Sequence, residues 1–205
     1  MPHKGPFLSI DSVHFCVAAG YCVIVRRPMD EKDAGFVEGQ VVLRTASPMD
    51  RDAVSILLEI SYSHLLRGSY DSNTLELALP YMVKANPMLL ASGTYYVAEA
   101  EPGTLVGCGG WTPEKPGSGE IVEGEAHIRH FAVHPDWIKR GIGTALLTRC
   151  IADTRLVGIH KLHCFSTLNA EPFYRASGFR TIGLIDVRMG PTIAFPTVLM
   201  QREIL

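Results

Sequence analysis

The sequence lacks most of the features that would place the protein outside the ordinary globular class. It has no Cys-x-x-Cys pair, and its five cysteines are odd in number and irregularly spaced. This usage favours reduced thiols over a disulfide framework. The formal net charge of −2 gives no general attraction to nucleic acid or to an anionic membrane surface. We therefore expect a cytoplasmic location and neither nucleic acid nor membrane as a partner.

The N-terminal part contains no segment that predicts a membrane span or a signal peptide. The apolar run 13–25 is too short to cross a bilayer. Arg26 and Arg27 follow it, and no small-residue cleavage site precedes a mature start. We predict that residues 1–39 form an N-terminal extension of uncertain structure, with an added strand or a dimer contact as alternatives. Residues 40–205 form the predicted functional domain.

From residue 40 the pattern of apolar residues becomes regular. The chain has 205 residues, 47% of them hydrophobic, which is enough for one domain with a sizeable core. Apolar periodicity predicts an alternation of strands and helices: strands at 41–47, 94–100, 104–112, 125–133, 161–167, 180–189 and 194–204, and helices at 48–66, 75–84, 141–156 and 169–178. We predict an α/β (α+β) fold with a single mixed, mostly antiparallel sheet of about seven strands and helices on both faces.

The stretch "HPDWIKRGIGTALL" (134–147) places two glycines where a helix begins. Glycine lets the backbone approach a ligand closely, and a helix N-terminus presents unpaired N–H groups to an anion. No Gly-Lys-Ser/Thr follows, so the stretch is not a P-loop, and Leu146 replaces the third glycine of a dinucleotide fingerprint. Taken alone, the loop also fits a plain strand-to-helix turn.

Two segments considered together are more informative than the loop alone. "HFAVHPDWIKRGIGTALL" (130–147) and "STLNAEPFYRASGF" (166–179) resemble the signature segments of the GNAT superfamily of acyl-CoA-dependent N-acetyltransferases. The family's loop reads Gln/Arg-x-x-Gly-x-Gly/Ala, and its later segment ends in Phe-Tyr-x-x-x-Gly-Phe. The resemblance covers about residues 40 to 201. Ile138 departs from the pattern, because the family prefers Gln or Arg there; Lys139 and Arg140 could supply the missing polarity.

The resemblance implies acetyl-CoA as the cosubstrate. No metal is expected. Backbone N–H groups would hold the pyrophosphate, with added charge from Arg140; the matching residues are Lys139, Arg140, Gly141, Ile142, Gly143 and Thr144. The backbone of Phe131 and Val133 would bind the pantetheine arm in the manner of an added strand. Asn169 matches a residue that often contacts the cofactor, although a plain helix cap explains it equally well.

The resemblance also suggests the catalytic residues. Tyr174 matches the proton donor to the departing thiolate, a role open to a phenol with pKa about 10; its alternative is packing between a helix and the sheet. His127 falls where several members carry a glutamate that deprotonates the amine. A histidine suits this task, but it is also common as a packed strand residue. Glu125, the loop residues Glu120 and Glu123, and water remain alternatives for the base.

Other candidates carry less weight. His127 and His130 would point to opposite faces of a regular strand, so a zinc site with His134 is not expected. Arg129, on the same face as His127, could bind a substrate carboxylate or be a surface strand residue. Cys108 and Cys164 have no visible activating partner, so neither is expected to act as a nucleophile. The "GCGG" run 107–110 is typical of a bulge or a close backbone approach.

We predict an N-acetyltransferase that transfers an acetyl group from acetyl-CoA directly to a primary amine of a small molecule or peptide. An acyl-CoA-binding sensor without turnover is the alternative. A module that acetylates a macromolecule such as tRNA would require a basic surface that the net charge does not supply. The expected acceptor pocket involves the last strands and the helical residues Tyr62, His64, Tyr70 and Tyr81. A homodimer stays open.

Overall fold

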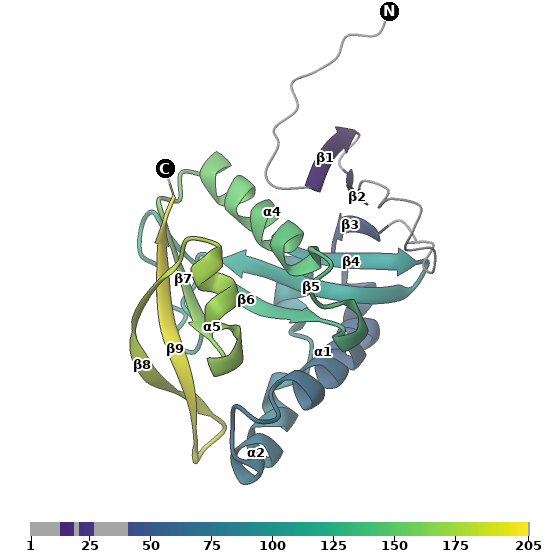
Figure 1. Cartoon of the computed structure of the whole chain (residues 1–205). Coiled ribbons are helices and arrows are strands. Elements are labelled where there is room, and N and C mark those ends of the chain that lie inside the picture. Colours follow the sequence, from purple (N-terminus) through teal and green to yellow (C-terminus); the bar gives the residue numbers. More distant parts are fainter. Residues whose placement is uncertain (1–12, 19–20, 27–40, 205) are drawn as a thin grey trace, which may run out of the picture.

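The computed structural model describes residues 13–18, 21–26 and 41–204 of the chain. They form a nine-stranded sheet in the order β1-β2-β3-β4-β5-β6-β7-β9-β8, and helices cover both of its faces (Figure 1). The described pairs are antiparallel apart from β6 with β7, which run parallel. The seven strands from β3 onward confirm the predicted mixed, mostly antiparallel sheet.

The elements follow the predicted order closely. They are β1 (Val13–Ala18), β2 (Tyr21–Arg26), β3 (Val41–Thr45), η1 (Pro48–Asp50), α1 (Arg51–Leu65), α2 (Ser72–Met82), α3 (Pro87–Ala91), β4 (Tyr95–Glu101), β5 (Thr104–Thr112), β6 (Glu125–Val133), η2 (Pro135–Trp137), α4 (Ile142–Leu156), β7 (Lys161–Ser166), η3 (Leu168–Ala170), α5 (Glu171–Ala176), β8 (Arg180–Met189) and β9 (Ile193–Glu203).

Two parts of the chain differ from the predicted pattern. The run 13–25, for which an added strand was only an alternative, overlaps two paired strands, β1 and β2, and β2 continues the sheet through its pairing with β3. The remainder of residues 1–40 lies outside the described residues, and the domain boundary at residue 39 stays a prediction. The short helix α3 was not expected; Asn86 caps it, because its side chain accepts a hydrogen bond from Met88 N.

Alternating side chains along the strands divide the core into layers. In β4, Tyr96 and Ala98 pack toward α4 and α5, whereas Tyr95 and Val97 pack toward α1 and α3. A third cluster surrounds Phe195 at the end of α1 and along α2. The sheet is therefore covered on both faces, and any site reached from both faces must pass through a gap between strands.

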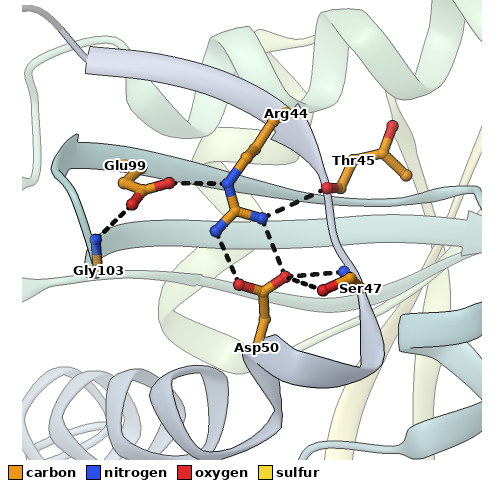
Figure 2. Close-up of polar contacts among 6 residues, drawn as sticks. All are labelled: Arg44, Thr45, Ser47, Asp50, Glu99 and Gly103. Carbon is orange, nitrogen blue, oxygen red and sulfur yellow. Dashed lines mark hydrogen bonds and ion pairs between the residues drawn. The ribbon is translucent and has the colours of Figure 1, made fainter.

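Arg44 joins three elements at the edge of the domain (Figure 2). Its guanidinium donates to both oxygens of Asp50, at 2.7 and 2.9 Å, and to Glu99 at 2.7 Å. Asp50 also accepts a hydrogen bond from Ser47 N at 2.7 Å. Asp50 is the N-cap residue of α1, but its carboxylate binds Arg44 and Ser47 instead of N–H groups of α1. The hydrogen bonds from Arg44 hold the pKa of Asp50 below its ordinary value.

We predict that Arg44→Met lowers the free energy of unfolding at pH 7 by about 1–3 kcal/mol, because the largely buried Asp50 loses its charged partner. The lowered pKa means that this stabilisation is present above the unfolded pKa of an aspartate and is lost as the pH falls through the folded value. The loss of unfolding free energy caused by Arg44→Met should therefore be smaller at acidic pH. Urea unfolding at pH 7 and pH 3.5 measures it, with the exposed Arg51→Met as the control. An equal loss in both variants would contradict this role for Arg44.

Candidate active site

The site begins where β6 and β7 separate. The two strands pair in parallel over only three residues of each, Glu125–His127 with Lys161–His163. A cavity of about 840 Å³ follows, and its wall includes residues 128–133 of β6 and 164–166 of β7. Cys164 belongs to the core layer under α4, and Ala132 belongs to the layer under α1. The cavity therefore reaches both faces of the sheet through the gap between the strands.

A β-bulge shapes the β6 wall. Cys108 pairs with Ala132 and Gly110 with Arg129, so two residues of β6, His130 and Phe131, lie opposite a single residue of β5. His130 adopts the left-handed region, with φ of 44°. The bulge takes the carbonyl groups of both residues out of the regular ladder.

Side chains hold these displaced carbonyls. Tyr95 Oη donates to His130 O at 2.9 Å, and Tyr62 Oη donates to Phe131 O at 3.2 Å. Cys108 Sγ also lies 3.7 Å from His130 O. The buried backbone acceptors of the bulge are therefore satisfied without the neighbouring strand, which keeps the bulge in place.

The glycines of β5 make room for this arrangement. A Cβ on Gly107 would lie 2.5 Å from Ile142 Cγ2, and a Cβ on Gly109 would collide with the ring of Phe131. The close backbone approach expected for the run 107–110 is confirmed. These glycines allow α4 and the Phe131 ring to lie directly on the sheet beside the cavity.

Beyond the bulge, the backbone of β6 turns polar groups toward the cavity. His134 N donates to Val106 O at 2.9 Å. Residues of an antiparallel strand alternate in the direction of their N–H and C=O groups, so those of Val133 point away from β5. Phe131 and Val133 both line the cavity. This placement fits their predicted contact with an extended pantetheine chain.

The start of α4 contributes the second wall. Its N-cap Gly141 is left-handed, with φ of 83°, and no side chain caps the helix. The cavity is lined here by residues that carry the unpaired first N–H groups of the helix: Gly141, Ile142, Gly143 and Thr144. The arrangement matches an anion cradle.

The two loop glycines serve different purposes. A Cβ on Gly141 would meet nothing within 4 Å, so its positive φ is what requires glycine. A Cβ on Gly143 would lie 3.3 Å from the Phe173 ring. Lys139 and Ile138 also line the cavity, whereas the guanidinium of Arg140 lies 4.7 Å from the centre of the Trp137 ring and is not part of the wall.

Tyr174 lies on the wall between the two halves of the cavity. Its ring is buried, with 5% of its surface exposed, and makes edge contacts with Phe131, Phe173 and Phe179. Burial, followed by the neighbouring Cys164 thiol, raises the pKa of Tyr174 well above its ordinary value. The phenol therefore retains its proton at neutral pH. Burial likewise raises the pKa of the Cys164 thiol, to about 12, as expected for an unactivated cysteine.

His127 lies behind the wall. It is 8% exposed, its ring stacks on His163 with centroids 5.1 Å apart, and it is not among the residues that line the cavity. Burial and the nearby His163 lower its pKa to about 4. Glu125 is held by Lys161 at 2.9 Å and by His163 at 2.8 Å. The proton-accepting role suggested for His127, or for Glu125, stays a prediction.

The bulge brings a different histidine and an arginine to the wall. His130 lines the cavity, and burial and the neighbouring Arg129 lower its pKa to about 4. Arg129 also lines the cavity and donates from Nη1 to Thr112 Oγ1 at 2.8 Å. Strict strand alternation did not single out His130. The local signal was the glycine run of the partner strand, which does not show where the extra residue falls.

Some of the other residues predicted to contact a substrate line the cavity, and some do not. Asn169 lines the cavity, and its amide donates to Leu65 O at 3.0 Å. Because Ala170 is the N-cap of α5, the helix-cap interpretation of Asn169 is wrong.

Of the suggested acceptor-pocket residues, Tyr62 and Tyr81 line the cavity. Tyr70 instead stacks on Phe195, and its hydroxyl bridges Leu168 N and Pro196 O; His64 is exposed.

Within residues 41–204 and the first two strands, no cluster of three or more His, Cys, Asp or Glu side chains is arranged to hold a metal ion. None of the helices in the described part of the chain is long and apolar enough to cross a membrane.

Comparison with known proteins places this geometry in context. Residues 91–181, which run from the end of α3 to the start of β8, match the family described as acetyltransferase (GNAT) domain. No curated protein matches the sequence. The fold is similar to a GCN5-related N-acetyltransferase from Rhodopseudomonas palustris, with a TM-score of 0.66 and 20% identity over 83% of this chain and 99% of that one.

Two further structures share the fold and were solved with coenzyme A. PaiA N-acetyltransferase from Thermoplasma acidophilum has a TM-score of 0.59 and 16% identity, over 80% of this chain and 98% of that one. N-acetylglutamate synthase from Neisseria gonorrhoeae, in complex with coenzyme A and N-acetyl-glutamate, has a TM-score of 0.52 and 18% identity, over 80% of this chain and 35% of that one. At these identities, the likeness establishes the fold.

We predict that Gly141→Asp weakens acetyl-CoA binding about 10- to 100-fold, because a carboxylate would stand at the anion cradle and a side chain would strain the left-handed backbone. Isothermal titration calorimetry measures the dissociation constant. Gly158→Asp is the matched control: Gly158 has φ of 78°, and a Cβ there also meets nothing within 4 Å, but it follows the other end of α4. Equal affinity in the two variants would remove the cradle from the binding site.

Proposed function

We propose that the chain, of which residues 91–181 match the GNAT acetyltransferase domain, transfers an acetyl group from acetyl-CoA directly to a primary amine. The observation that supports this most strongly is the cavity that crosses the sheet between β6 and β7. It joins the uncapped start of α4 to Tyr174 and continues to the face covered by α1 and α2. Two substrates entering from opposite faces would meet in the gap.

Different residues of the cavity wall would bind different parts of acetyl-CoA. The N–H groups at Ile142, Gly143 and Thr144 would hold the pyrophosphate, with Lys139 beside them at the wall. The backbone of Val133 would bind the pantetheine arm along β6, and Phe131, whose carbonyl accepts from Tyr62, would line the path of the arm. Asn169 lies on the same wall and is proposed as a further contact to the cosubstrate. This binding would leave the thioester beside the bulge.

The bulge also offers help at the reacting carbon. Phe131 has no partner in register on β5, so its N–H is free of the regular ladder. We infer that this N–H faces the oxyanion that forms as the amine attacks, while Tyr62 and Tyr95 keep the neighbouring carbonyls turned away by binding them. A fixed donor at a developing negative charge lowers the barrier more than a mobile one does.

Two protons must move in this reaction. The departing thiolate receives one, and the buried phenol of Tyr174 can donate it because the phenol stays protonated at neutral pH. The amine loses the other. His130 is the histidine on the described wall of the cavity. Burial lowers its pKa to about 4, so the imidazole is neutral at physiological pH but is a weak proton acceptor, and its position on the wall is what favours it. We therefore infer His130 as the acceptor, in preference to His127 behind the wall.

We predict that the wild-type protein releases the coenzyme A thiol only when an acceptor amine is present, and that Tyr174→Phe lowers kcat about 10²-fold or more. Its affinity for acetyl-CoA should stay nearly constant, since the hydroxyl acts in the transition state. Thiol release and calorimetry measure the two quantities. Tyr96→Phe, which removes another buried hydroxyl bound to Asp153, is the control.

The same measurements separate the alternatives. An unchanged kcat in Tyr174→Phe would leave its side chain with packing alone. Saturable acetyl-CoA binding without thiol release across a broad amine panel would support the acyl-CoA-binding sensor and contradict the transferase.

We also predict that His130→Gln lowers kcat/KM between pH 7 and 8 about 10²-fold, while His127→Gln keeps most of it. An imidazole accepts a proton only while neutral, so with a pKa near 4 its activity falls only as the pH drops toward 4, well below the ordinary value of about 6.5. The acceptor amine is also protonated in acid, so kcat/KM is divided by the neutral fraction of the amine. The acid side of the corrected pH profile then reports the protonation of the histidine. If kcat/KM fell only in His127→Gln, the result would instead support His127 as the base.

A further inference from the structure

We propose that the acceptor is a small amine that also carries a carboxylate, and that Arg129 binds this carboxylate. The inference rests on the proposed transferase function and concerns the half of the cavity that faces α1, α2 and the β8–β9 hairpin. It follows from the position of Arg129, from the charges of the wall and from the way this end of the cavity is covered.

Arg129 is a partly buried cation with open donor capacity. Its Nη1 donates to Thr112 Oγ1 at 2.8 Å, and Thr112 Oγ1 in turn donates to Glu114 O at 3.0 Å. This chain of bonds fixes the guanidinium at the wall. A guanidinium has five N–H donors, so one bond to a hydroxyl leaves donors for the two oxygens of a carboxylate.

Among the described residues, no protein carboxylate forms an ion pair with this cation. Among the described residues that line the cavity there is neither Asp nor Glu; the charged side chains there are Arg129, Lys139 and Arg188. Glu114 is not within ion-pair distance of Arg129 in the described structure, and Glu125 is bound by Lys161 and His163. Burial is the largest influence on Arg129 and lowers its pKa; Glu114 is near enough to raise that pKa, but its effect is smaller than that of burial.

This charge pattern selects among amines. A diamine or a lysine side chain would bring a second positive group or a cationic surrounding into a wall that already carries cations, which is unfavourable at short range. An amino acid brings its own negative charge. Because Arg129 directly precedes His130, a carboxylate held by Arg129 would leave the amine of the same small molecule close to the bulge.

The covering of this end favours a small acceptor. The tip of the β8–β9 hairpin reaches α2 (Figure 1): a Cβ on Gly190 would lie 2.7 Å from Tyr81 Oη. Both residues line the cavity, as do Pro116 and Gly117 of the loop before β6. A compact amino acid fits beneath these segments more readily than a folded protein surface does.

The test compares L-amino acids with their own amides, which keep the size and the amine but lose the negative charge. For the wild-type protein we expect kcat/KM to favour the acid over the amide about 10- to 100-fold. In Arg129→Ala this preference should fall to near one, through a higher KM for the acids. Arg129→Lys should restore part of it, and the exposed Arg155→Ala on α4 is the control.

A binding measurement keeps this inference separate from the proposed function. With coenzyme A saturating, N-acetyl amino acids and their amides are titrated into the wild-type protein and Arg129→Ala. Tighter binding of the acids that depends on Arg129 would support the inference even without turnover. Equal binding or equal turnover of acids and amides in the wild type would overturn it, while acetylation of the amides would leave the transferase function intact.

Discussion

The site depends on the separation of β6 from β7 after three paired residues. Full pairing would close the gap and leave two covered faces with no passage between them. The bulge at His130 and Phe131 follows the last residue of β6 that pairs with β7, and it releases backbone groups of β6 from the ladder with β5. Tyr62 and Tyr95 then bind the released carbonyls. The strand is therefore irregular for a structural reason, and its free N–H groups become available to a ligand.

The same constraint explains the glycines and the aromatic cluster. Gly107 and Gly109 let Ile142 and the Phe131 ring press on β5, which brings the start of α4 beside the gap. Tyr174 packs against Phe131 and Phe179 and thus lies between the cradle and the bulge. Chemistry and packing share these residues, since the contacts that stabilise α5 also hold the phenol in position.

Local patterns predicted the parts of the structure that local sequence determines. The strand limits of β5 and β6, the start of α4 at its glycine loop and the wall position of Tyr174 follow from periodicity and from the two motifs. The bulge was not predictable, because it depends on how many residues lie between paired positions of two strands. That single extra residue places His130 on the wall. Arg140 and Asn169 were assigned from motif positions. Asn169 lies on the wall while its amide donates to Leu65 O, and the Arg140 guanidinium lies against the Trp137 ring.

The central claim is that the gap between β6 and β7, together with the uncapped start of α4, forms one binding path for acetyl-CoA. A crystal structure of the protein with coenzyme A tests it most directly. The account predicts the pyrophosphate on the N–H groups of Ile142, Gly143 and Thr144, and the pantetheine arm along Phe131 and Val133 with its sulfur near Tyr174. Coenzyme A bound on the outer surface, with β6 and β7 paired across the gap, would contradict it.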